Sequence, residues 1–250
     1  MPVILIILIL LLLFGAKHLP DMGYRLGKKS RKQYRQAKWV WSWLSGTEDE
    51  SIRAERDYGR ECAREFIKQF PGGVSSDDQE LVSTVGSRLV DALQDPRREF
   101  QFTVVPSPTT NAYALPGGFV FITKPLLEVT ERDRNEIAFF LGHEIGHIVL
   151  GHAKEQLTAK TLLNAVSSRL SGAGNLLRQM VGQGYSRTLE LAADREGARL
   201  AAAAGFQSDA SIKALRRLSR IAPDRTGFEE YFSSHPPFSE RLEELGKSTH

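Results

Sequence analysis

The sequence predicts an α+β fold that is mainly helical, with a small β-hairpin or edge strand beside one central helix. A proline-free stretch from Asp133 to Leu150, which contains the apolar run Phe139–Leu150, predicts that helix. Amphipathic stretches on both sides of it predict further helices. Alternating β-branched and aromatic residues between positions 100 and 122 predict the strands.

The elements before the central helix are bounded by turn residues and candidate caps. A helix is expected over Ser51–Phe70, ended by Pro71-Gly72-Gly73, and a second one begins after a cap at Asp77 or Asp78 and runs to Leu93. Strands are expected over Phe100–Val105, within Asn111–Gly118 and over Phe119–Ile122, and Pro125–Val129 begins a helical stretch. The second and third strands are separated by a Pro-Gly-Gly turn and therefore form a hairpin.

Two further helices are expected after the central one. Ala153–Leu170 continues helical, and an alanine-rich helix follows over Ser186–Gly205. Between Lys160 and Arg187 no apolar run approaches 18 residues, which excludes a second membrane span there.

Composition places the chain among ordinary globular proteins. Apolar residues make up 41% and charged residues 25% of the 250 positions, which excludes bulk disorder. A lone cysteine, Cys62, excludes both an intramolecular disulfide framework and a cysteine-rich zinc site.

The positive charge is concentrated near the N-terminus. The segment from Lys17 to Trp41 holds eight Lys or Arg residues and one Asp, whereas the whole chain carries a net charge of only +3. The remainder of the chain is therefore slightly acidic, so we expect no nucleic-acid partner.

Residues 1–16 predict a short membrane anchor. Val3–Phe14 is uninterrupted apolar sequence, and a helix of this length spans about 24 Å. A cleaved signal peptide would begin with a positive charge, and Phe14-Gly15-Ala16-Lys17 is a poor cleavage site. A soluble core helix would contain polar positions, so the anchor is the favoured interpretation.

Residues 17–45 predict a basic amphipathic segment on an anionic membrane surface. Leu19, Met22 and Leu26 recur at helical spacing among basic residues, and all three tryptophans lie between positions 39 and 43. The alternative is a solvated basic helix whose tryptophan cluster packs on the main domain. Gly46–Glu50 reads as a polar linker that opens a domain covering residues 46–250.

This N-terminal segment resembles the A-type subunit of the twin-arginine protein translocase. The resemblance is carried by Leu12-Leu13-Phe14-Gly15, Leu19-Pro20, Leu26-Gly27-Lys28 and the basic residues up to Lys38. It implies a short membrane helix, a surface helix and possible membrane-protein partners through residues 1–40. Translocase activity is not implied, because the polar residue near the start of that family's membrane helix is absent. We expect a single-pass protein of a bacterial-type inner membrane. The basic flank after the anchor predicts that the C-terminal domain faces the cytoplasm, and the periplasmic face is the alternative.

The central helix carries the pattern His143-Glu144-x-x-His147. Residues four apart lie on one helix face, so both imidazoles could hold one zinc ion. Glu144 would lie beside the open coordination position and could take a proton from a zinc-bound water. The alternative, a buried helix with two hydrogen-bonded histidines, would be costly without a metal.

Two acidic residues on the alanine-rich helix are candidate partners of this motif. Glu190 and Asp194 share a face, where Glu190 could be the third ligand and Asp194 could orient a ligand histidine. Alternatively, both acids lie on the surface and pair with Arg187, Arg195 or Arg199. His152 is one residue out of register for a third histidine ligand, so we interpret it as a non-ligand.

Together these motifs resemble the HtpX- and BepA-like zinc metalloendopeptidases, which are membrane-associated gluzincins that also include prenyl-protein processing proteases. The resemblance covers about residues 50–250 and adds Ser234-His235-Pro236-Pro237 with an arginine six residues after the histidine. It implies a gluzincin-type domain, one zinc ion per chain held by His143, His147 and Glu190, and Asp194 behind a ligand histidine. His235 and Arg241 are implied near the active site, where one stabilises the oxyanion or gates the zinc. The additional membrane helices of the multi-pass HtpX members are absent.

These features predict a membrane-anchored zinc metalloendopeptidase that cleaves unfolded or misfolded proteins in quality control. Glu144 would be the general base, and the substrate would lie along an edge strand made by Asn111, Ala112, Tyr113, Ala114 and Leu115. One alternative is a latent enzyme or a membrane-tethered chaperone on the same zinc fold; in the latent form, His235 would occupy the fourth zinc position. Another alternative is a scaffold for translocase partners.

Overall fold

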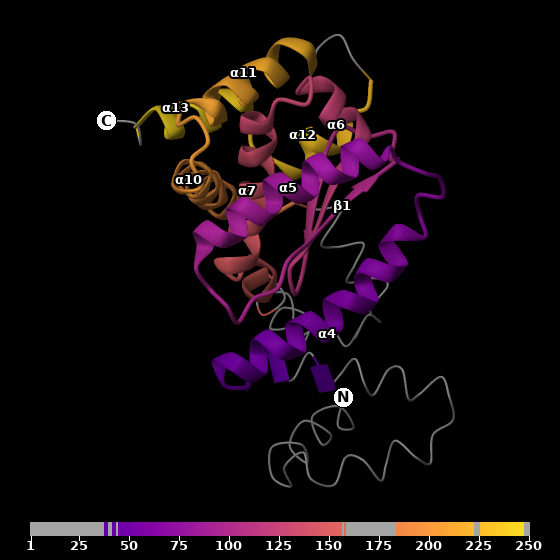
Figure 1. Cartoon of the computed structure of the whole chain (residues 1–250). Helices are drawn as coiled ribbons and strands as arrows, with labels where there is room; N and C mark the ends of the chain where they lie inside the picture. Colours follow the sequence, from indigo (N-terminus) through magenta and orange to yellow (C-terminus); the bar gives the residue numbers. More distant parts are fainter. Residues whose placement is uncertain are drawn as a thin grey trace, which may run out of the picture.

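The computed structural model describes residues 38–39, 42–43, 45–156, 158, 184–222 and 226–247 (Figure 1). The expected membrane anchor, most of the basic segment and most of the helix expected over Ala153–Leu170 lie outside these residues. Among the residues that are described, no helix combines the length and apolar character needed to cross a bilayer.

The described part is mainly helical with one three-stranded sheet, which confirms the predicted class. Its elements are α4 (Glu48–Ile67), α5 (Ser76–Leu93), β1 (Gln101–Val105), β2 (Ala112–Leu115), β3 (Phe119–Thr123), α6 (Lys124–Val129), α7 (Arg134–Val149), α10 (Arg187–Ala203), α11 (Ala210–Ile221), α12 (Glu229–Ser234) and α13 (Phe238–Lys247). Helices α11 to α13 were not among the expected elements.

Capping residues begin the first two helices earlier than expected. Thr47 and Glu50 form a capping box, so Glu48–Glu50, interpreted as linker, is the first turn of α4. The cap of α5 is Ser75 and not Asp77 or Asp78. The Asp78 carboxylate accepts two hydrogen bonds from Arg132 instead, at 2.7 and 3.1 Å.

The sheet has the order β1-β3-β2. Strands β2 and β3 pair antiparallel as the predicted hairpin, and β1 pairs parallel with β3. The turn between β2 and β3 contains Gly117 and Gly118, both at positive φ, where a side chain would be strained. Strand β2 is therefore an edge of the sheet within the described residues.

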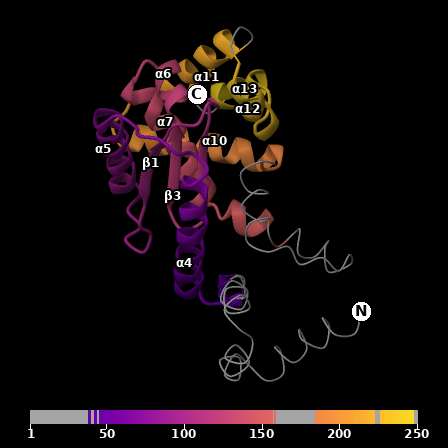
Figure 2. The same ribbon diagram turned by 90° about the vertical axis from the view of Figure 1, so that its right-hand side faces the viewer.

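The sheet is packed between helices on its two faces. Phe119 and Phe121 of β3 pack in one cluster with residues of α4, whereas Val120 and Ile122 pack in another with residues of α5 and α7. Figure 2 shows α4 running alongside the strands. Trp39 and Trp43 have ring contacts with Tyr58 of α4 at 6.4 and 6.3 Å, so for these two residues the packed alternative is the one observed.

Helix α7 lies at the centre of the molecule and is buried from Glu136 to Ile148. It packs closely against α10 at two glycines: a Cβ atom on Gly197 would lie 2.6 Å from the His143 nitrogen, and one on Gly142 would lie 2.8 Å from the Gly197 carbonyl oxygen. The two backbones therefore approach each other directly beside His143, and this approach brings the acids of α10 to the histidines of α7.

Candidate metal centre

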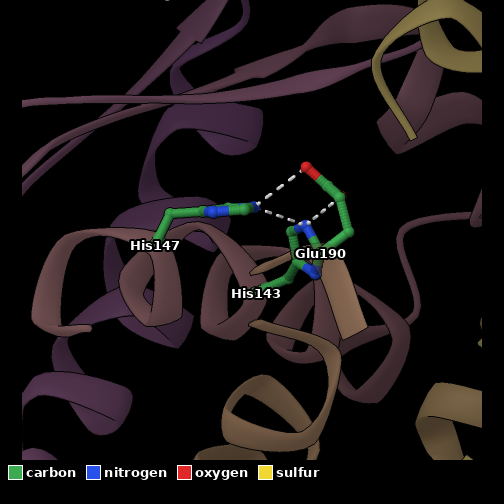
Figure 3. A group of neighbouring side chains, drawn as sticks. All are labelled: His143, His147 and Glu190. Carbon is green, nitrogen blue, oxygen red and sulfur yellow. Dashed lines mark hydrogen bonds and ion pairs between the residues drawn. The ribbon is translucent and has the colours of Figure 1, made fainter. Parts of the chain in front are cut away.

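Three predicted ligands converge between α7 and α10 (Figure 3). The Nε2 atoms of His143 and His147 are 3.0 Å apart, and each lies 3.5 Å from a carboxylate oxygen of Glu190. Tetrahedral coordination with ligand bonds near 2.1 Å would place ligand atoms about 3.4 Å apart. The separations therefore fit a single metal ion held by these three side chains.

Burial and charge at this point also fit a divalent cation. All three side chains are at most 3% exposed, and the Oε2 atom of Glu190 is buried without a hydrogen-bond partner. An isolated buried carboxylate oxygen is unfavourable unless a cation lies beside it. Arg241 neutralises Asp194, so Glu144 and Glu190 remain as the two carboxylates that a divalent ion would balance.

Asp194 holds His143 from behind. Its Oδ1 atom lies 2.9 Å from the Nδ1 atom of His143, and Arg241 donates to both of its oxygens, at 2.8 and 2.5 Å. Burial alone would raise the pKa of Asp194, but Arg241 and His143 outweigh it and hold that pKa below its usual range. Asp194 is therefore a carboxylate in the folded protein, and it fixes the orientation of the His143 ring.

The alternative of two surface acids is excluded by the same geometry. Glu190 and Asp194 are 1% and 0% exposed. The three arginines considered as their partners pair elsewhere: Arg187 with Glu240, Arg195 with Glu244 and Arg199 with Glu196.

Glu144 faces a small cavity beside the ligand atoms. The cavity measures about 30 Å³, and its lining includes Ala112 and Ala114 of β2, together with Tyr185 and His235. Burial raises the pKa of Glu144 to about 7. A carboxyl group with a pKa near neutrality can both take up and return a proton, as a general base requires.

His235, at the C-terminal end of α12, lines the same cavity as Glu144. Its Nε2 atom is 3.7 Å from the Oε2 atom of Glu190, and its ring stacks on Tyr231 at 4.5 Å. The Nδ1 atom lies 2.8 Å from the Ser234 hydroxyl and 3.2 Å from the Tyr231 carbonyl oxygen. Burial lowers the pKa of His235 to about 4, so its imidazole is neutral near pH 7.

Arg241 lies behind the metal ligands. Its buried guanidinium donates to Asp194 and to the Tyr231 hydroxyl, and the ring of Tyr231 stacks in turn on His235. The family resemblance implies a place for Arg241 near the active site, and in the structure its guanidinium lies within hydrogen-bond distance of Asp194. Its hydrogen bonds, however, go to Asp194 and Tyr231 and not to a metal ligand.

The strand residues predicted to bind substrate lie on β2 and immediately before it. Asn111, Ala112, Tyr113 and Ala114 line the small cavity, and Leu115 lines a second cavity of about 290 Å³. Ala114, His147 and Tyr185 line both, so the two cavities adjoin.

Two residues that contact the metal ligands were not expected to do so. Tyr185 stacks on the His147 ring at 4.3 Å, and its backbone nitrogen donates to Glu190 Oε1 at 3.4 Å. His152, interpreted as a non-ligand, places its Nδ1 atom 2.8 Å from the Nδ1 atom of His147. The position of His152 five residues after His147 could have indicated this contact, whereas no sequence pattern indicated Tyr185.

Comparisons with known proteins agree with this centre. Residues 1–38 match the model of the mttA/Hcf106 family. The chain is 35% identical over 165 residues to the mitochondrial metalloendopeptidase OMA1 of Bos taurus, which covers 58% of the chain and 31% of that protein. It is 31% identical over 178 residues to the mitochondrial metalloendopeptidase OMA1 of Saccharomyces cerevisiae, covering 66% and 50%, and 29% identical over 147 residues to the metalloprotease YcaL of Escherichia coli, covering 54% and 56%.

The chain thus spans about a third of the length of the Bos taurus relative and about half of the other two. A second family model, described as Peptidase family M48, matches residues 76–249. That range holds His143, Glu144, His147, Glu190 and Asp194, which the structure brings together. Because the match covers most of the chain and includes the whole candidate metal centre, the chain belongs to peptidase family M48.

Proposed function

We propose that this chain is a membrane-anchored, zinc-dependent metalloendopeptidase that hydrolyses peptide bonds in unfolded or extended proteins. The observation that carries the proposal is the convergence of His143, His147 and Glu190 with Glu144 directly beside them. The names of the relatives, metalloendopeptidase and metalloprotease, support the same reaction class.

A zinc ion bound by these ligands would lower the pKa of a water molecule and polarise the scissile carbonyl group. Glu144 would take a proton from the attacking water as the water oxygen adds to the carbonyl carbon. It then delivers this proton to the amide nitrogen as the C–N bond breaks, which leaves one carboxylic acid and one amine. His143 is held in place meanwhile by Asp194, and Asp194 by Arg241.

The edge strand β2 supports an extended polypeptide as substrate. A substrate strand beside Asn111–Leu115 would be held by backbone hydrogen bonds, which select an extended chain more than a particular sequence. The adjoining cavity of about 290 Å³ offers room for one large side chain. Folded proteins seldom present a free extended segment, so we infer a role in protein quality control.

The N-terminal segment supports attachment to a membrane. Residues 1–16 are apolar, the following segment is basic, and residues 1–38 match the mttA/Hcf106 family. We infer contact with membrane lipid, a bacterial-type inner membrane and a catalytic domain on the cytoplasmic side, with the periplasmic side as the alternative. Membrane-protein partners through residues 1–40 belong to the same proposal.

The proposal is tested by replacing Glu144 with glutamine in the full-length chain. Glu144→Gln should bind zinc like the wild type but lose cleavage of an unfolded protein, because the amide cannot take a proton from water. Glu155→Gln is the matched control, since Glu155 is exposed on the helical turn after α7 and should retain cleavage. Undiminished cleavage by Glu144→Gln would rule out the general-base role.

A latent enzyme or a holding protein on the same metal fold is the second candidate. Two acceptor oxygens near His235 Nδ1 favour a proton on that nitrogen, which leaves Nε2 unprotonated near Glu190. In that form Nε2 could occupy the fourth position on the metal, and the small cavity could not admit a peptide strand. If the resting enzyme is latent, His235→Ala should cleave faster than wild type; slower cleavage would assign His235 to catalysis.

A further inference from the structure

His152 is a buried histidine that the proposed reaction does not use. It is 3% exposed and lies just after the end of α7. Gly151, at a φ of +71°, separates the end of α7 from the helical turn that begins at His152. This turn brings the His152 ring back against His147, with ring centroids 5.0 Å apart and the two Nδ1 atoms 2.8 Å apart.

Two ring nitrogens at hydrogen-bond distance share one proton. The Nε2 atom of His147 points at His143 Nε2 and at Glu190, at 3.0 and 3.5 Å, and is thus the atom available to a metal. A metal-binding nitrogen must offer its lone pair, so the proton of neutral His147 lies on Nδ1. His147 therefore donates to His152 Nδ1, and His152 carries its own proton on Nε2.

The opposite proton arrangement would be incompatible with the metal. If His152 donated to His147 Nδ1, neutral His147 would carry its proton on Nε2 and could not use that nitrogen as a ligand. In the metal-binding tautomer His152 Nδ1 is the acceptor of the His147 proton, and its position sets the direction of the His147 ring. Tyr185 supports the same orientation by stacking on the ring face at 4.3 Å with an interplanar angle of 21°.

We propose that His152 is a positioning residue that holds His147 in its metal-binding tautomer, as Asp194 does for His143. The inference rests on the proposed metal centre and deepens it. The two ligand histidines then differ: His143 donates to a carboxylate, and His147 donates to a neutral imidazole. A neutral acceptor orients His147 without adding another negative charge to a site that already holds three buried carboxylates.

The role is tested with two substitutions at this position in the full-length chain. His152→Leu fills space but removes the acceptor, and losing such a partner typically lowers metal affinity by about 10- to 100-fold. His152→Asn places an acceptor oxygen on Cγ, where histidine has Nδ1, and should keep the affinity within a few-fold of wild type. Asp91→Leu, exposed on α5, is the control and should leave the affinity unchanged.

The zinc dissociation constant is measured by competition with a chromophoric chelator. The melting temperature of each variant is recorded with and without zinc, because a purely structural role would lower the zinc-free value but not the gain on adding zinc. The ¹⁵N shifts of the His147 ring in the zinc-free protein report its tautomer directly. We expect the Nδ1–H form in wild type and His152→Asn and a mixture in His152→Leu.

Wild-type affinity in His152→Leu, or an equal loss in both His152 variants, would overturn the inference. A wild-type protein that binds zinc in a His152-dependent way but does not cleave would refute the proposed hydrolase activity and leave the role of His152 intact. A wild-type protein that binds no zinc would overturn both.

Discussion

At the residue scale, the centre depends on buried charges that are balanced in pairs. Asp194 and Arg241 are 0% and 1% exposed, and each satisfies the other through two hydrogen bonds. A buried pair of this kind adds little net stability, but removing one partner leaves the other charge uncompensated. The pair therefore keeps Asp194 ionised behind His143. The fold is destabilised only when one partner is removed and the other charge stays buried.

Asp194→Asn should destabilise the protein by about 3–5 kcal/mol, because it leaves the Arg241 guanidinium buried without a counter-charge. Denaturant unfolding of the zinc-free protein measures this loss. Asp209→Asn is the control: Asp209 pairs with Lys213 at 2.9 Å, but both side chains are more than half exposed, so its loss should stay below about 1 kcal/mol. Equal losses in the two variants would contradict the buried-pair account.

The protonation states of the three ligands predict how zinc binding depends on pH. The pKa of His147 is lowered far below its ordinary value by burial, and the charges around Glu190 overcome the effect of its burial and lower its pKa to about 2. His143 differs: burial opposes its protonation, but Asp194 and Glu190 outweigh burial and raise its pKa to about 9. At pH 7.5 only His143 carries a proton that zinc must displace.

Zinc binding at pH 7.5 should therefore release about one proton, and the apparent affinity should rise about tenfold per pH unit up to about pH 9. In the zinc-free protein the same raised pKa stabilises the fold fully below pH 6.5, and this contribution is lost as the pH rises through 9. Titration calorimetry in two buffers with different ionisation enthalpies measures the released proton. A binding heat independent of the buffer would refute this assignment.

At the scale of elements, local sequence patterns correctly predicted those helices and turns that depend mainly on neighbouring residues. The apolar run gave α7, the alanine-rich stretch gave α10, and the Pro-Gly-Gly turn gave the hairpin β2–β3. The parallel pairing of β1 with β3 was not foreseen, because it joins residues about 18 positions apart and is decided by packing. Likewise, spacing placed Glu190 and Asp194 on one face of a helix but could not tell whether that face was buried.

The face of α10 is decided by its glycine contact with α7, which yields a prediction. Gly197→Ala should lower stability by about 1–3 kcal/mol, because its Cβ would meet the His143 backbone at 2.6 Å. It should also weaken zinc binding, since α10 must shift and carries Glu190. Gly246→Ala is the matched control, as its Cβ would meet nothing within 4 Å in helix α13. If a folded Gly197→Ala protein bound zinc with unchanged affinity, the close contact between α10 and α7 would not be required for the metal centre.

At the scale of the whole molecule, the folded domain and the N-terminal segment meet within the tryptophan cluster. Trp43 is 2% exposed and belongs to the core cluster of α4 and β3, although the domain was expected to begin at residue 46. Its indole ring can fill a core as well as a membrane interface, so sequence alone could not decide between them. The described fold therefore includes Trp43, whereas the match to the mttA/Hcf106 family ends at residue 38.

This division predicts separate effects of two changes. Deleting residues 1–38 should move the protein from the membrane to the soluble fraction while its melting temperature and its cleavage of an unfolded substrate stay at the full-length values. Trp43→Ala in the full-length chain should remain with the membrane but lose about 3–5 kcal/mol of stability, because it empties a fully buried position next to Tyr58. Cell fractionation and thermal unfolding, run on both proteins, measure the two effects. A deleted chain that still sediments with membranes would place the attachment in the catalytic domain, and a Trp43→Ala protein as stable as wild type would place the start of the folded unit after residue 43.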